Sequence, residues 1–219
     1  MKYKCLILDH DDTVVNSTAT IHYPSFIEYL KVRRPHTVSN YTLESFISKN
    51  FTPGIVSLFR DELGMSDEEM AEEQKFWERF VNTRVPVAYG GIAEIIAEMR
   101  SRGGIIAVAS HSMGEFIKRD YSENGLSLPD EIYGWELPRE KRKPATFAVD
   151  ELISKYGFDR KEILMVDDLK PGFDMARAAG IDFAAAGWAY DVPEISDFMR
   201  RHSDYYLSEV SELYKLLFD

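Results

Sequence analysis

The sequence of 219 residues contains one cysteine, Cys5, and no long apolar run. A single thiol cannot form an intrachain disulfide, so we expect a reducing compartment. No stretch approaches the ~20 apolar residues that a membrane-spanning helix needs. The apolar residues 5–8 are too few for the core of a signal peptide. These absences favour a cytoplasmic protein with no membrane-bound part.

The chain also lacks an excess of basic residues, because 26 Lys and Arg stand against 37 Asp and Glu, for a net charge of −11. Nucleic acids and anionic membranes need a basic field, so we exclude both as partners. A small anionic ligand stays compatible, since a metal ion and one or two lysines reverse the potential locally. The composition, 45% hydrophobic and 29% charged, is typical of a soluble globular protein.

Strands and helices alternate over most of the chain. Short apolar runs predict strands at 5–8, 105–109, 163–166, 183–186 and 205–207. Apolar residues at helical spacing predict helices over 92–99, from Pro144 to Tyr156, over 174–179 and over 210–217. This alternation predicts an α/β fold with a parallel sheet that is covered on both faces.

The stretch from about Ser17 to Pro86 differs, because it shows helical periodicity and no convincing strand. Breaks fall at residues 34–36 and 52–54, and Ser66 with Glu69 forms a capping box that opens the last helix. The sequence therefore predicts a separate helical module within the α/β chain.

The first predicted strand ends in three carboxylates, Asp9, Asp11 and Asp12. Adjacent carboxylates repel one another unless a cation or a nest of donors offsets them, so a divalent metal ion is one explanation. The other is an acidic turn in which Asp12 or Thr13 caps a following helix. This stretch alone leaves both readings open.

Polar residues also follow the strands at 105–109 and 163–166, as Ser110-His111-Ser112 and Asp167-Asp168. The carboxyl ends of parallel strands share one edge of the sheet, so we expect these groups to converge with Asp9 and Asp11. Taken singly, Ser110, Ser112 or Asp168 fits a helix cap.

Lys143 stands just before the helix predicted to open at Pro144, where the helix dipole disfavours a cation. A bound anion at that end of the sheet explains a lysine there. The alternative is a solvated basic face over residues 139–143.

Together these motifs resemble the haloacid dehalogenase-like superfamily of phosphohydrolases, in its phosphoglycolate phosphatase-like form with a helical cap. The resemblance implies a Rossmann-like doubly wound parallel sheet core over 1–17 and 88–219, with an inserted all-helical cap domain over 18–87. The matching residues, in chain order, are Asp9, Asp11, Thr13, Ser110, Lys143, Pro144, Asp167 and Asp168.

The resemblance also implies a role for each matching residue. Asp9 is the nucleophile that forms an aspartyl-phosphate, and Asp11 is the general acid and base. Lys143 neutralises charge on Asp9, while Ser110, His111 and Lys143 bind the phosphoryl group. The implied cofactor is Mg²⁺, and its ligands are the Asp9 carboxylate, the Asp11 carbonyl oxygen and Asp168, with or without Asp167.

Three positions depart from the family pattern. Asp12 replaces a common glycine, and aspartate tolerates unusual backbone angles better than most residues. His111 replaces a common asparagine and places a titratable ring near the expected substrate. Gly172 stands where many relatives have a further aspartate.

We expect a Mg²⁺-dependent phosphatase of small phosphorylated metabolites, present as a monomer or weak homodimer. A β-phosphoglucomutase-like phosphomutase of the same family would use the same residues. A non-catalytic binding module would have no reason to keep them together. A serine hydrolase lacks support, because Ser110 is not in a Gly-x-Ser-x-Gly elbow, and no glycine-rich loop indicates a nucleotide-binding protein.

Overall fold

The computed structural model describes residues 1–219, which form two compact units, 1–15 with 87–219, and 16–86. The first unit contains a six-stranded sheet in the order β3-β2-β1-β4-β5-β6, and every pairing is parallel. The strands are β1 Cys5–Leu8, β2 Ile105–Ala109, β3 Glu131–Tyr133, β4 Ile163–Asp167, β5 Asp182–Ala186 and β6 Tyr205–Leu207. The predicted α/β fold with a doubly wound parallel sheet is confirmed.

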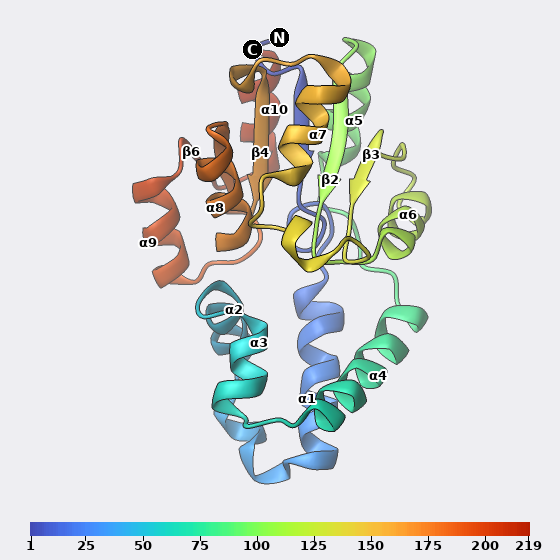
Figure 1. Cartoon of the computed structure of the whole chain (residues 1–219), viewed down its shortest axis with the longest axis vertical. Coiled ribbons are helices and arrows are strands. Elements are labelled where there is room, and N and C mark those ends of the chain that lie inside the picture. Colours follow the sequence, from blue (N-terminus) through green and yellow to red (C-terminus); the bar gives the residue numbers. More distant parts are fainter. The chain divides into compact units, whose positions relative to one another are not determined.

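Helices cover both faces of this sheet (Figure 1). They are α5 Ile92–Ser101, α6 Gly114–Glu123, α7 Phe147–Tyr156, α8 Lys170–Ala179, α9 Pro193–His202 and α10 Val210–Phe218. Apolar residues of α5, α6 and α10 pack in one core with alternate residues of the central strands, such as Leu6 and Leu8. Because β1 is paired on both sides, it is buried throughout, and its end is fixed in the middle of the carboxyl edge.

The structure corrects two local expectations and adds two elements. The helix expected at Pro144 begins at Phe147, because residues 142–145 form a turn closed by the Ala145 N–H and the Arg142 carbonyl (2.8 Å). Helix α8 begins four residues before the expected position 174, since Pro171 is compatible with a first helical turn. Strand β3 and helix α9 were not expected.

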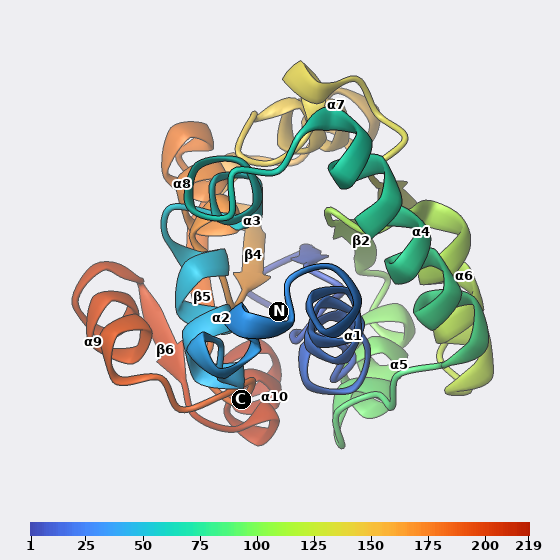
Figure 2. The ribbon, with the colours of Figure 1, turned by 90° about the horizontal axis from the view of Figure 1, so that it is seen from below.

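The second unit is helical, as expected for this stretch, and Figure 2 gives a second view of its helices. It contains α1 Tyr23–Arg33, α2 Leu43–Phe51, α3 Ile55–Ser57 and α4 Asp67–Thr83. Its own core is rich in aromatic residues, among them Phe26, Tyr29 and Phe46. The predicted capping box of Ser66 and Glu69 opens α4. No helix of either unit has both the length and the apolar character needed to cross a lipid bilayer.

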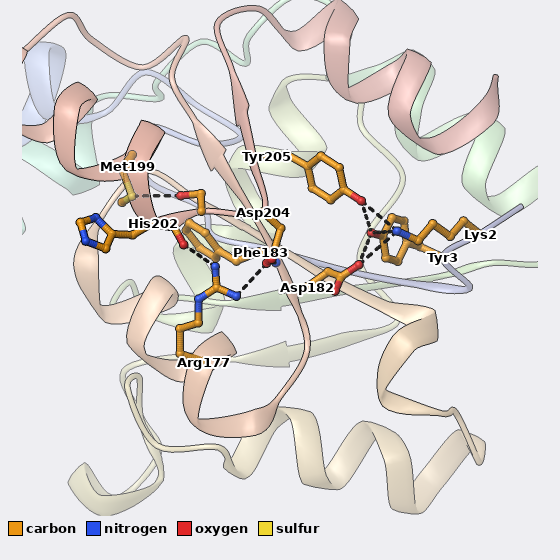
Figure 3. A network of polar contacts seen from close by, with 10 residues as sticks. Lys2, Tyr3, Arg177, Asp182, Phe183, Met199, His202, Asp204 and Tyr205 are labelled. Atoms are coloured by element: carbon orange, nitrogen blue, oxygen red, sulfur yellow. Dashed lines mark hydrogen bonds and ion pairs between the residues drawn. The ribbon is translucent and has the colours of Figure 1, made fainter.

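A network of polar contacts lies at the amino ends of β1, β5 and β6 (Figure 3). The Tyr3 hydroxyl donates to Asp182, and Lys2 Nζ lies 3.2 Å from the same carboxylate and 2.8 Å from the Tyr205 hydroxyl. The network thus ties the start of the chain to the far strands of the sheet. Both chain ends lie at this amino-end edge (Figure 1).

Candidate active site

The loop after β1 is a tight turn that presents its acids at the carboxyl edge. The Asp9 N–H still donates to the Val166 carbonyl of β4 (2.9 Å), so Asp9 continues the strand pairing. The His10 carbonyl then accepts the N–H groups of Val14 and Val15. Asp12 adopts a left-handed conformation with φ 56°, as expected where relatives have glycine.

Three carboxylates meet where β1 and β4 end. Asp9, Asp167 and Asp168 each offer an oxygen within 4.8 Å of the others, and all three side chains are buried. Buried like charges at this separation need a cation, and carboxylate oxygens are the ligands that Mg²⁺ prefers. The donor set therefore fits the divalent cation expected from the sequence.

Lys143 supplies the one ammonium group found between these acids. Its Nζ lies 2.9 Å from Asp9 Oδ1 and also contacts Asp167 Oδ2. Burial lowers the pKa of Lys143, but the charges of Asp167 and Asp9 outweigh it and raise the pKa above its ordinary value. Lys143 therefore stays charged, and its position does not depend on a helix start, because α7 begins at Phe147.

One lysine does not balance the buried acids. Burial raises the pKa of Asp167 to about 7 against the opposing charge of Lys143. Burial, with the charges of Asp167 and Asp12, raises the pKa of Asp168 well above its ordinary value. Burial is the main cause of both shifts, and neighbouring acids add to it; a bound divalent cation would favour the ionised carboxylates again.

Gly172 explains one departure from the family pattern. A Cβ atom at this position would overlap the Asp167 carboxylate. The glycine therefore leaves the room that Asp167 needs to reach Lys143, and an aspartate at 172 is incompatible with this placement of Asp167.

The loop after β2 brings polar groups to the same edge. The Ser112 hydroxyl contacts Asp11 Oδ2, and Ser110 Oγ accepts the Ser112 N–H (3.1 Å). Helix α6 has Met113 at its N-cap and no side-chain cap, so neither serine caps it. Ser112 thus joins this loop to Asp11, and Ser110 contacts Ser112. Asp168 caps no helix either, because the N-cap of α8 is Leu169.

His111 forms a hydrogen bond with the backbone of Lys143. Its Nε2–H donates to the Lys143 carbonyl oxygen (3.0 Å), and its ring meets Trp135 edge-on. The side chain is exposed at the surface, yet desolvation by its neighbours and then the charge of Lys143 lower the pKa of the imidazole. A neutral ring therefore borders the site.

Sequence reasoning missed three residues that hold this arrangement. Tyr190 donates a hydrogen bond to Asp168, and Trp188 Nε1 donates to the Thr13 carbonyl oxygen (3.2 Å). His10 lies buried between Asp9 and Asp11, and its Nε2 is 3.0 Å from Asp120 on α6. Only His10 carried a signal, a polar residue within an apolar and acidic stretch.

A family model described as haloacid dehalogenase-like hydrolase matches residues 6–186. A phosphoglycolate phosphatase from Aliivibrio fischeri is 29% identical over 111 residues, which cover 50% of this chain and 48% of that protein. The match therefore spans about half the length of this curated relative.

Solved structures share the fold. One, described as a predicted phosphoglycolate phosphatase from Haemophilus somnus, has a TM-score of 0.78 at 18% identity, with 99% of each chain covered. A haloacid dehalogenase family hydrolase from Deinococcus radiodurans, with bound phosphate and sodium, has a TM-score of 0.74 at 18% identity. That alignment covers 99% of this chain and 95% of the other. These identities establish the fold alone.

Proposed function

The chain belongs to the haloacid dehalogenase-like hydrolases, and we propose that it is a phosphatase that cleaves phosphate monoesters of small metabolites through a phosphorylated Asp9. The observation that carries this proposal is the Lys143 ammonium group in contact with both Asp9 and Asp167, beside Asp168. A lysine held among buried acids at the edge of a parallel sheet suits a reaction at an anionic phosphoryl group.

In the proposed reaction an Asp9 carboxylate oxygen attacks phosphorus, and the bond from phosphorus to the ester oxygen breaks. Asp11 donates a proton to the departing alkoxide, so the first product leaves as an alcohol. Asp11, now a carboxylate, takes a proton from a water molecule that attacks phosphorus, and the bond between phosphorus and Asp9 breaks. This step releases inorganic phosphate and restores the Asp9 carboxylate and the protonated Asp11. The contact from the Ser112 hydroxyl orients Asp11 for both steps.

The phosphoryl oxygens would be held by Lys143 together with the Ser110 hydroxyl and the backbone N–H of the neighbouring His111. Asp9 and Asp168, with or without Asp167, would hold Mg²⁺ together with the Asp11 carbonyl oxygen. The ion, when bound, would supply positive charge that stabilises the negatively charged phosphoryl group. Lys143 meanwhile offsets negative charge where the Asp9 carboxylate meets the anionic phosphoryl group, since its ammonium group contacts Asp9.

We propose that the helical insert at 18–87 serves as the cap that governs access to the site.

A cytoplasmic setting is supported by the one buried thiol, Cys5. Phosphoglycolate, named in the Aliivibrio fischeri relative, is the first substrate to test. Hydrolysis is favoured over phosphomutase activity by the match to a hydrolase family.

The test is release of inorganic phosphate from a panel of phosphorylated metabolites by the purified protein with Mg²⁺. Asp9→Asn should abolish release and leave the circular dichroism spectrum unchanged, because the amide is not nucleophilic. Asp197→Asn, which alters an exposed carboxylate on α9, is the matched control and should leave the rate unchanged. Turnover that survives Asp9→Asn contradicts the covalent route, and no turnover of any panel member contradicts the phosphatase.

A further inference from the structure

Both carboxylate oxygens of Asp168 accept a hydrogen bond from a side chain outside its own strand and loop. Thr13 Oγ1 donates to Oδ1 (3.2 Å), and the Tyr190 hydroxyl donates to Oδ2. A carboxylate rotates easily about its last side-chain torsion. Two donors on opposite oxygens therefore fix the plane of the Asp168 carboxylate, which is 3% exposed.

Tyr190 belongs to a segment, residues 187–192, that joins β5 to α9. Two backbone hydrogen bonds shape it, from Gly187 to the Ala185 carbonyl (3.0 Å) and from Ala189 to the Ala186 carbonyl (3.2 Å). Buried Val192 anchors its far end. The segment is thus an ordered turn, and it directs the Tyr190 hydroxyl toward Asp168.

The same segment also holds the first acidic loop. Trp188 Nε1 donates to the Thr13 carbonyl oxygen (3.2 Å), and Thr13 in turn donates to Asp168. Trp188, Thr13, Asp168 and Tyr190 therefore form one closed set of contacts that links the ends of β1, β4 and β5. The family match ends at residue 186, just before this segment.

We propose that Tyr190 is a positioning residue that orients Asp168 toward the divalent cation, and that Trp188 fixes the Thr13 loop to the same end. The inference rests on the proposed function, because it presumes that Asp168 is a metal ligand. Carboxylates that bind metals are themselves hydrogen-bonded, and loss of such a partner weakens metal binding by about 10- to 100-fold.

A purely structural hydroxyl would act differently, and the chain provides a matched control. Tyr206 lines the same small cavity as Tyr190 and Asp168, but its hydroxyl donates to Ser196 Oγ (3.2 Å). Removing either hydroxyl deletes one hydrogen bond beside the cavity. Of these two hydroxyls, only that of Tyr190 contacts a carboxylate of the acidic cluster.

The experiment is calorimetric titration of metal-stripped full-length protein with Mg²⁺. Tyr190→Phe should raise the dissociation constant by about 10-fold or more, while Tyr206→Phe stays within about twofold of the wild type. In phosphate-release assays, the Mg²⁺ concentration for half-maximal activity should rise in parallel for Tyr190→Phe. Its kcat at saturating Mg²⁺ should return to near the wild-type value, because the reacting groups are intact.

Thermal unfolding in EDTA checks that each variant folds. Trp188→Phe removes the other contact of the segment and is a second test, with an expected rise in the Mg²⁺ dissociation constant of about threefold or more. If the Tyr190→Phe variant does not fold, the Mg²⁺ affinity of the Trp188→Phe variant is the measurement that decides. An unchanged Mg²⁺ affinity in the folded Tyr190→Phe variant overturns the inference and leaves the phosphatase proposal standing. Wild-type protein that binds no Mg²⁺ overturns both.

Discussion

The Nζ atom of Lys143 lies 2.9 Å from Oδ1 of Asp9, and both side chains are almost fully buried. The same ammonium group contacts Asp167, so one cation serves two carboxylates from different strands. Removing it leaves both acids without their shared partner.

We therefore expect Lys143→Gln to lower phosphatase activity by about 100-fold or more. We also expect the variant to lose about 3 kcal/mol of unfolding free energy, because an uncompensated buried charge is costly. Initial rates and urea unfolding measure the two effects. Lys118→Gln, an exposed lysine on α6, is the control. Full activity in the Lys143→Gln variant would exclude a role for Lys143 in the reaction.

Gly172 gives a second prediction, because an added methyl group there meets the Asp167 carboxylate. Gly172→Ala should displace Asp167 from Lys143, lower activity and reduce stability by about 1–3 kcal/mol. Gly90→Ala is matched to it, since a Cβ at Gly90 has open space around it, and should change neither. Equal behaviour of the two variants in rate and urea-unfolding measurements would refute the steric argument.

Glu73 on α4 predicts how the stability of the helical unit depends on pH. Burial raises its pKa to about 7, with the charge of His22 opposing the shift. Between the ordinary value of 4.5 and about 7, the native state holds a proton that the unfolded chain has lost. The contribution of Glu73 to the free energy of unfolding is therefore fully present below pH 4.5, and it is lost as the pH rises toward about 7.

Glu73→Gln should accordingly stabilise the protein above pH 7, by up to about 3 kcal/mol, and have little effect near pH 4.5. The measurement is urea unfolding at a series of pH values, with the exposed Glu78→Gln on the same helix as the control. A gain that is equal at all pH values would show that proton binding is not its cause.

The Tyr3 hydroxyl contacts Asp182 and lies 3.1 Å from the Tyr205 hydroxyl (Figure 3). These residues lie at the amino ends of β1, β5 and β6, whereas the carboxylate cluster lies at the carboxyl ends of β1 and β4. Tyr3→Phe should cost about 1–2 kcal/mol of stability, because it deletes a partly buried hydrogen bond to a carboxylate. It should leave kcat and KM unchanged. Chemical unfolding and steady-state kinetics test both, with the more exposed Tyr214→Phe as the control. A change in kcat would mean that the two edges of the sheet are coupled.

The sequence revealed the strands that carry the site because each is a short apolar run followed by polar residues. Strands 105–109 and 205–207 have the expected bounds. Strand β3 was missed because its three residues, Glu-Ile-Tyr, contain no apolar run. Helix α9 has only a few apolar positions among charged residues, so its periodicity is faint.

The limits at the site have a similar cause. Lys143 was singled out because a helix was expected to open at Pro144, but that premise was wrong, because residues 142–145 form a turn and α7 begins at Phe147. Tyr190 and Trp188 left no signal, since an aromatic residue after a strand is usually part of a core. Their contacts depend on how β5 lies beside β4, which only the folded chain reveals.

Both ends of the chain lie at the amino-end edge of the sheet (Figure 1), whereas the acids lie where β1 and β4 end. An affinity tag, fluorophore or solid support joined to either end would therefore attach at the edge remote from the acids. The protein can thus be immobilised through its termini for kinetic work without obstructing the cluster of Asp9, Asp167 and Asp168.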